Sequence, residues 1–153
     1  PCFNLIVSTL ASQWFEDLPR ALDRLFAALR PGGHLFFSTM ADRSFQEWRA
    51  AHAVHGLVAG TPDYPTLADL GRMLAHLPDS ALCDEDYPIA WGSARAFLGH
   101  LRTIGATVPR PGRAPLTAAQ LKRVMTTFDQ GGALCTYHVA FARLSRLPRH
   151  SIP

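Results

Sequence analysis

The first 39 residues contain a strand, a helix and a second strand, and this order constrains the fold more than any other feature. Phe3 to Ser8 (FNLIVS) is a short apolar run, typical of a strand that is covered on both faces. Leu18 to Leu29 carries apolar residues at helical spacing, and His34 to Thr39 (HLFFST) is a second short apolar run. A strand, a helix and a strand joined by short loops form a βαβ unit, in which the two strands are parallel.

The rest of the chain predicts more helices and two more strands. The expected helices run over Ser44 to His55, Thr66 to Leu77, Ser93 to Ile104 and onward from Thr117, and each begins at a hydroxyl residue that can cap it. The expected strands are Leu82 to Trp91 and Leu134 to Leu144. We therefore predict an α/β fold, half of a doubly wound sheet, in the order 3–8, 34–39, 134–144, 82–91. The long last strand is expected to be antiparallel between its neighbours.

The segment between the first strand and the first helix is the first candidate binding site. It reads STLASQW from Ser8 to Trp14, with small hydroxyls, an amide and a large ring directly after a buried strand. Ligands of open α/β sheets bind outside the carboxyl ends of the strands. The alternative is structural: Gln13 caps the loop and Trp14 belongs to the core.

Cysteines, histidines and hydropathy exclude several classes of protein. The three cysteines show no CxxC spacing, so neither a disulfide framework nor a zinc site is expected, and we interpret them as buried reduced thiols. His52 and His55 are spaced like two metal ligands but lack an obvious third, so we expect no metal. No apolar stretch approaches the roughly 20 residues of a membrane span. No basic segment of a signal peptide is present, so a cytoplasmic location is expected.

The positive charge is concentrated in one segment. The formal net charge is only +3, but no Asp or Glu occurs from Tyr87 to Phe128. The same segment holds six basic residues: Arg95, Arg102, Arg110, Arg113, Lys122 and Arg123. Such a segment favours an anionic partner or substrate, the alternative being a solvated basic face. Nucleic acid is not expected, because no recognised binding motif accompanies the charge.

Several motifs give a specific resemblance. The segment from Phe3 to Thr39 resembles strands four and five of the class I, S-adenosylmethionine-dependent methyltransferases. Its closest likeness is to the malonyl-acyl-carrier-protein O-methyltransferases of biotin synthesis, where Ser8, Leu10, Gln13 and Trp14 match the strand-four motif. The later motifs LRTIGA (101–106) and TYH (136–138) occur in the order of that family. The resemblance extends over about residues 3–142.

The resemblance implies a cofactor, a substrate and positions for both. Ser8, Thr9 and Leu10 would lie at S-adenosylmethionine, while Gln13, Trp14, Arg102 and Tyr137 would contact the substrate. Arg102 is the first choice for the substrate carboxylate, and Arg110 and Arg113 would meet solvent or an acidic carrier protein. The implied reaction forms the methyl ester of a malonyl thioester, carried by acyl carrier protein or coenzyme A. No catalytic acid or base is implied, because a carboxylate is already ionised at neutral pH.

The resemblance covers only the second half of the family's domain. The sequence has no counterpart of the glycine-rich turn after the first strand or of the acidic residue that holds the ribose. We therefore interpret residues 1–144 as the carboxyl-terminal part of a methyltransferase domain, with a cap over about 93–128. Residues 145–153 are expected to be a disordered basic tail. The alternatives are a methyltransferase for another small molecule and a non-catalytic fragment or interaction module.

Overall fold

The fold is α/β, as predicted, and contains one four-stranded sheet. The computed structural model describes residues 2–104, 106 and 115–148. The strands are β1 (Phe3–Ser8), β2 (Leu29–Met40), β3 (Ser80–Ala90) and β4 (Leu134–Ser145). The helices are the 3-10 turn η1 (Ser12–Trp14), α1 (Leu18–Ala28), α2 (Gln46–Ala53), α3 (Leu67–Leu74), α4 (Ala94–Thr103) and α5 (Ala118–Gln130). None of the described helices is long and apolar enough to cross a membrane.

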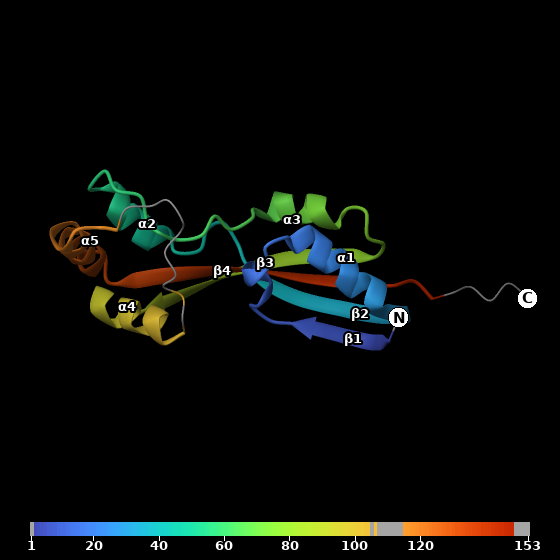
Figure 1. Cartoon of the computed structure of the whole chain (residues 1–153). Helices are drawn as coiled ribbons and strands as arrows, with labels where there is room; N and C mark the ends of the chain where they lie inside the picture. The colour runs from blue at the N-terminus through green and yellow to red at the C-terminus, as the bar shows by residue number, and fades with distance from the viewer. Residues whose placement is uncertain (1, 105, 107–114, 149–153) are drawn as a thin grey trace, which may run out of the picture. The chain divides into compact units, whose positions relative to one another are not determined.

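The order of the strands is the predicted one. The sheet runs β1-β2-β4-β3, with β1 parallel to β2 and β4 antiparallel to β2 (Figure 1). In the parallel pair Val7 lies opposite Phe36 and Ser8 opposite Phe37. The carboxyl ends of β1 and β2 therefore lie at the same edge of the sheet, where the candidate loop begins.

The chain divides into two compact units. Unit 1 consists of residues 1–42, 64–85 and 138–153, and unit 2 of residues 43–63 and 86–137. Unit 1 contains β1, β2, α1 and α3, and unit 2 contains α2, α4 and α5. Strands β3 and β4 each contribute residues to both units. The helices α4 and α5 precede strand β4 in the sequence, and the cap over about 93–128 stays a prediction.

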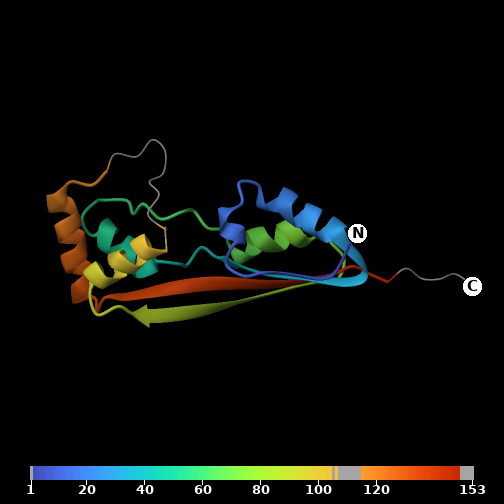
Figure 2. The same cartoon turned by 60° about the horizontal axis from the view of Figure 1, so that its bottom comes forward.

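The core of unit 1 lies between one face of the sheet and two helices. Helices α1 and α3 lie on the same face of the sheet (Figures 1 and 2). The buried residues there are Leu22, Leu29, Leu35, Phe37, Leu74, Ala142 and Leu144. Asp17 caps α1 by accepting a hydrogen bond from the Arg20 amide at 3.0 Å, and Pro19 lies in the first turn, where no donor is lost.

The opposite face of β1 corrects one prediction. A strand covered on both faces was expected at residues 3–8, but Phe3, Leu5 and Val7 are 53%, 56% and 59% exposed. Phe36, which lies opposite Val7, is 42% exposed. Burial within the described chain therefore accounts for the apolar side chain on one face of β1 and leaves those on the other face exposed.

The core of unit 2 is aromatic. Trp48 of α2, Phe97 of α4 and Phe128 of α5 contact one another with ring centroids 5.1–5.4 Å apart. Phe97 is fully buried, and Trp48 and Phe128 are nearly so. Such ring pairs add to the free energy gained from burying the rings themselves. Three helices are therefore fixed to one another at one cluster.

Two of the long strands extend beyond their predicted limits. Strand β2 begins at Leu29 and ends at Met40, whereas the predicted strand ran from His34 to Thr39. At the same end of the sheet, Ser145 belongs to β4, and the Arg146 amide donates to the Gly33 carbonyl at 2.9 Å. The Arg146 guanidinium also donates to the carbonyls of Ala27 and Leu29. The expected disordered tail therefore does not begin at 145, and residues 149–153 lie outside the described residues.

Candidate functional site

The loop after β1 is held in an unusual backbone conformation at Leu10. Ser8 ends the strand half-buried, and Thr9 and Leu10 follow exposed. Leu10 has φ of 46°, in the left-handed region that non-glycine residues seldom occupy. The Leu10 amide donates to the Ser38 carbonyl at 3.2 Å and to the Ser38 hydroxyl at 3.1 Å. Residues in sparsely populated conformations cluster at ligand sites, so this loop is the first place to look for one.

Ser12 and Ser38 anchor the loop and were not among the predicted site residues. Ser12 is buried, and its hydroxyl donates to the Ser38 carbonyl at 2.8 Å. Ser38 lies near the end of β2 and therefore receives two segments of the loop that follows β1. A signal was present in the sequence: both strands end in Ser-Thr, and the carboxyl ends of parallel neighbours lie together.

Gln13 caps the loop with one end of its amide and leaves the other end unused. Its Nε2 donates to the Leu10 carbonyl, which is the structural role considered from the sequence. Its Oε1 is buried and accepts no hydrogen bond within the described part of the chain. A buried carbonyl oxygen without a donor is costly, so this atom is suited to a donor on a bound molecule.

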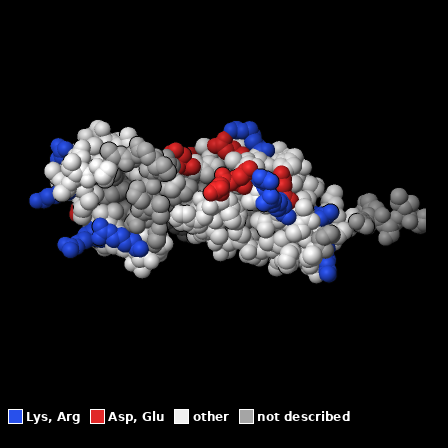
Figure 3. Space-filling model, in the orientation of Figure 1, with Lys and Arg blue, Asp and Glu red and all other residues white. Residues whose placement is uncertain are grey.

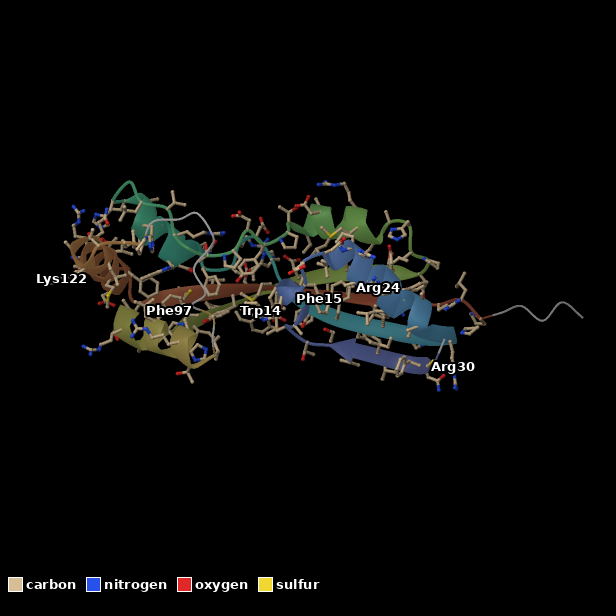
Figure 4. All side chains as sticks on the ribbon, in the orientation of Figure 1. Trp14, Phe15, Arg24, Arg30, Phe97 and Lys122 are labelled. Atoms are coloured by element: carbon tan, nitrogen blue, oxygen red, sulfur yellow. The ribbon has the colours of Figure 1, made fainter. Side chains whose placement is uncertain are left out.

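Trp14 is not part of the core. Its side chain is 61% exposed, and its neighbours Phe15 and Leu10 are 41% and 44% exposed (Figure 4). Large apolar side chains gathered at one loop of a soluble protein mark a surface that a ligand or another segment covers. The core alternative for Trp14 is therefore wrong.

The two remaining predicted residues lie in unit 2. Arg102 is exposed in the last turn of α4, which Ser93 caps by accepting from the Ala96 amide at 3.1 Å. Tyr137 is half-buried in β4, and its ring meets the ring of Phe45 edge-on at 5.1 Å. Within unit 1 the structure brings Ser8, Thr9, Leu10, Gln13 and Trp14 together in one loop. Arg110 and Arg113 lie outside the described residues.

Next to Tyr137, Glu47 and Thr136 form a contact between distant parts of the chain. Ser44 was expected to cap the helix that follows it, but α2 begins after Phe45, whose φ is 60°, and no side chain caps it. The Glu47 carboxylate instead accepts from the Thr136 amide at 2.8 Å and from the Thr136 hydroxyl. Burial alone would raise the pKa of Glu47, but these hydrogen bonds outweigh burial and lower it.

The two histidines considered as metal ligands each lie within hydrogen-bond distance of a helical residue, and the three cysteines differ in exposure. His52 Nδ1 lies 2.8 Å from the Trp48 carbonyl, and His55 Nε2 lies 2.8 Å from the Thr127 hydroxyl. No group of three metal-binding side chains occurs among the described residues. Cys2 and Cys83 are exposed, contrary to the expectation of three buried thiols, and Cys135 is buried. Burial, with the nearby Glu47 charge, raises the pKa of Cys135 to about 12, so its thiol stays protonated.

Comparisons with known proteins agree on one kind of domain. Residues 2–77 match the family model described as a methyltransferase domain. The chain is 47% identical over 147 residues to the biotin biosynthesis bifunctional protein BioCD of Bordetella avium. It is 38% identical over 146 residues to the malonyl-[acyl-carrier protein] O-methyltransferase of Magnetococcus marinus. The crystal structure of the YcgJ protein of Bacillus subtilis, 14% identical, shares the fold with a TM-score of 0.55 over 95% of this chain and 64% of that one.

The chain is shorter than these curated relatives. The alignments cover 96% and 94% of this chain but only 31% of the Bordetella protein and 54% of the Magnetococcus protein. Nearly the whole chain is therefore aligned, whereas much of each relative has no counterpart in it.

Proposed function

The chain belongs to the class I methyltransferases, and from this premise we propose that it serves in methyl transfer to the free carboxylate of a malonyl thioester. The methyl donor in this proposal is S-adenosylmethionine, and the product is a methyl ester made for biotin synthesis in the cytoplasm. The enzyme also needs the cofactor-binding strands of which this sequence has no counterpart. The observation that supports the substrate most directly is the 38% identity to a malonyl-[acyl-carrier protein] O-methyltransferase across 94% of this chain.

The loop after β1 fits a cationic cofactor that carries its methyl group on sulfur. Ser8 and Thr9 have small side chains, so backbone carbonyls at the end of β1 are open to a sulfonium. Leu10 presents exposed apolar surface for the non-polar part of such a molecule, and Gln13 and Trp14 are proposed to face the substrate. The Gln13 Oε1, which has no donor among the described residues, is suited to accept a hydrogen bond from a bound molecule. S-adenosylmethionine supplies the activated methyl group, and the residues of the loop supply position.

The chemistry requires alignment more than acid or base catalysis. A carboxylate with an ordinary pKa near 4 is ionised at neutral pH and needs no general base. The displacement is in line, so the carboxylate oxygen has to be held about 3 Å from the methyl carbon with water excluded. Trp14 has the size to exclude water from the loop when a substrate covers its exposed ring.

Arg102 is the proposed partner of the substrate carboxylate. A guanidinium binds a carboxylate through two parallel hydrogen bonds, and the described part of the chain shows no ion pair for Arg102. Tyr137 is proposed to contact the same substrate, since its ring lies half-buried in unit 2. Acyl carrier protein is the proposed carrier of the malonyl group, with coenzyme A as the competing carrier.

The test is transfer of a labelled methyl group by the full-length enzyme. We expect malonyl-acyl carrier protein to become labelled as a base-labile methyl ester, whereas acetyl-acyl carrier protein, which lacks the free carboxylate, stays unlabelled. Trp14→Ala should lower kcat/KM more than Arg20→Ala, an exposed change on α1. Equal labelling of the acetyl and malonyl substrates would contradict carboxylate methylation, and full activity of Trp14→Ala would remove the loop from the site.

A further inference from the structure

The helices α4 and α5 carry basic side chains on their exposed surfaces. Arg95 lies in the first turn of α4, and Lys122 and Arg123 lie in the first half of α5; all three are exposed. The two helices pack against each other through the buried rings of Phe97 and Phe128. We call the exposed basic side chains of these two packed helices together the α4–α5 surface; Figure 3 shows blue side chains in several separate places at the left end of the view.

No carboxylate neutralises this surface within the described chain. Asp129 is the one acidic residue of the two helices, and its Oδ1 accepts a hydrogen bond from the Ala94 amide at the start of α4. Neither Arg95, Lys122 nor Arg123 forms an ion pair with a described residue. A solvated protein surface normally mixes both signs of charge, and a surface of one sign attracts the opposite sign.

In unit 1, by contrast, some of the basic side chains lie next to acidic ones. There Arg143 lies 3.3 Å from Asp79, and His76 lies 2.8 Å from Asp23. Helix α1 also mixes signs, because Arg20 and Arg24 are interspersed with Asp23. What distinguishes α4 and α5 is that their exposed charged residues are all basic apart from Asp129, which bonds to the Ala94 amide, whereas α1 carries the acidic Asp23 between Arg20 and Arg24.

We propose that the α4–α5 surface, through Arg95, Lys122 and Arg123, docks the acidic surface of the carrier protein that delivers the malonyl group. This inference rests on the proposed function and adds to it the surface that recognises the carrier. Charge complementarity supports a protein partner, because three cations on two helices exceed what the single carboxylate of a malonyl group can engage. Arg102 is reserved for that carboxylate, so the docking residues are separate from it.

Docking by exposed charges acts mainly on the rate of association. Pairs at a wet rim contribute little each, and their attraction is screened over about 8 Å at physiological salt. Loss of such charges should therefore raise KM for the carrier-bound substrate and leave kcat nearly unchanged. For a substrate that lacks the carrier protein, KM and kcat should both stay unchanged when these charges are removed.

The experiment compares two substrates of the full-length enzyme at low and high salt. The substrates are malonyl-acyl carrier protein and malonyl-pantetheine, which keeps the thioester and the carboxylate but has no protein. The variants are Arg95→Glu and the double reversal Lys122→Glu/Arg123→Glu. The matched control is Arg20→Glu/Arg24→Glu, which changes the charge equally on the exposed surface of α1 (Figure 4).

We expect each α4–α5 reversal to lower kcat/KM for malonyl-acyl carrier protein by about tenfold at low salt. The difference should disappear at high salt, and neither malonyl-pantetheine nor the control should respond. An equal loss on both substrates, or a loss as large in the α1 control, would overturn the docking surface. An unchanged rate in the reversals would also overturn it, whereas inactivity of the wild-type enzyme on both substrates would instead refute the proposed function.

Discussion

Arg102 is the single side chain on which the proposed substrate recognition depends most directly. It lies exposed in the last turn of α4, where two neighbouring features fix the helix: the Ser93 cap and the buried ring of Phe97. A guanidinium at this position offers two parallel donors to a carboxylate, and an ammonium offers a point charge.

Replacing Arg102 by Lys should therefore weaken catalysis although the charge is kept. Loss of one arm of a charge-assisted pair costs on the order of 1.5–3 kcal/mol, or roughly tenfold to over a hundredfold in kcat/KM. Steady-state kinetics on a malonyl thioester measures the effect. Arg95→Lys, on the same helix, is the control, and its kcat/KM should stay within about twofold of the wild-type value. If Arg102→Lys keeps the wild-type kcat/KM at every salt concentration, Arg102 does not bind the substrate carboxylate.

Thr136 offers a residue-scale test of the contact beside Tyr137. Its hydroxyl and amide hold the Glu47 carboxylate and lower its pKa in the folded protein. A carboxyl group with a lowered folded pKa stabilises the fold above its unfolded pKa, and this stabilisation is lost as pH falls through the folded pKa. Thr136→Val should lower the free energy of unfolding by about 1–2 kcal/mol at pH 7.

The difference between wild type and Thr136→Val should shrink as the pH falls below the unfolded pKa of Glu47, close to 4.5. Denaturant titrations at pH 7 and pH 3 measure it. Thr126→Val removes a hydroxyl that bonds only to the Lys122 carbonyl on the surface of α5, and it should show a small effect at both pH values. If Thr136→Val destabilises the protein equally at both pH values, the loss comes from altered packing and not from the hydrogen bond to the Glu47 carboxylate.

At the scale of elements, β1 and β2 depend on the close approach of their backbones at Gly33. A Cβ atom there would lie 3.1 Å from the carbonyl oxygens of Phe3 and Asn4 and 2.9 Å from that of Arg30. All three neighbours are backbone atoms, so they cannot turn away as a side chain would. The same segment contains a shift in register between Phe3 and Leu5.

Gly33→Ala should therefore destabilise the pairing of β1 with β2, by about 1–3 kcal/mol in the free energy of unfolding. Thermal or denaturant unfolding measures the loss. Gly71→Ala in α3 is the matched control, since its Cβ would meet no atom within 4 Å. The control should gain about 0.5–1 kcal/mol, because alanine is the better helix former. If Gly33→Ala has the wild-type free energy of unfolding, β1 and β2 can move apart at this point without loss of stability.

Local sequence patterns predicted most elements, and contacts between distant residues account for the errors. The capping boxes at Thr66 and Thr117 are present because both partners lie within four residues of each other. The cap expected at Ser44 is absent, and the carboxylate of Glu47, three residues later, accepts instead from Thr136, which is 89 positions away. The start of β2 was missed for the same kind of reason, since Gly33 is paired with Arg146.

The candidate loop shows the same division between local and distant information. Its residues follow one another in the sequence, so the hydroxyls, Gln13 and Trp14 could be named from a single stretch. Ser38 could not, because its role depends on the parallel register of β1 and β2. Arg102 and Tyr137 were chosen by resemblance, and their roles at a substrate stay predictions.

At the scale of the whole molecule, the strand order agrees with the prediction because a βαβ unit and one long late strand leave few arrangements. The division into two units was not predicted, and two of its four boundaries fall within the long strands β3 and β4. No composition shift marks such a boundary, since a strand keeps its pattern across it. Helix α2 therefore joins α4 and α5 in unit 2, although only residues 93–128 were expected to form a cap.

The chain alone should not bind S-adenosylmethionine with useful affinity. Its sequence contains the loop proposed for the sulfonium end but neither the glycine-rich turn nor the acidic residue for the ribose. Calorimetric titration of the 153-residue chain should show no saturable heat at micromolar concentrations. A micromolar dissociation constant would mean that the loop after β1 binds the cofactor without those elements.

The central position of β4 sets the order in which the sheet can be completed during synthesis. Ribosomes make the chain from its amino terminus, so β1, β2 and β3 emerge before β4. Because β4 lies between β2 and β3, neither of these strands has its common neighbour until residues 134–145 have left the exit tunnel. Until then the nascent chain exposes the edges of β2 and β3 that β4 later covers, and unpaired edges of this kind are prone to aggregation and are bound by chaperones. Closure of the sheet is therefore a late step, completed when the Arg146 amide reaches the Gly33 carbonyl of β2 and its guanidinium reaches the end of α1.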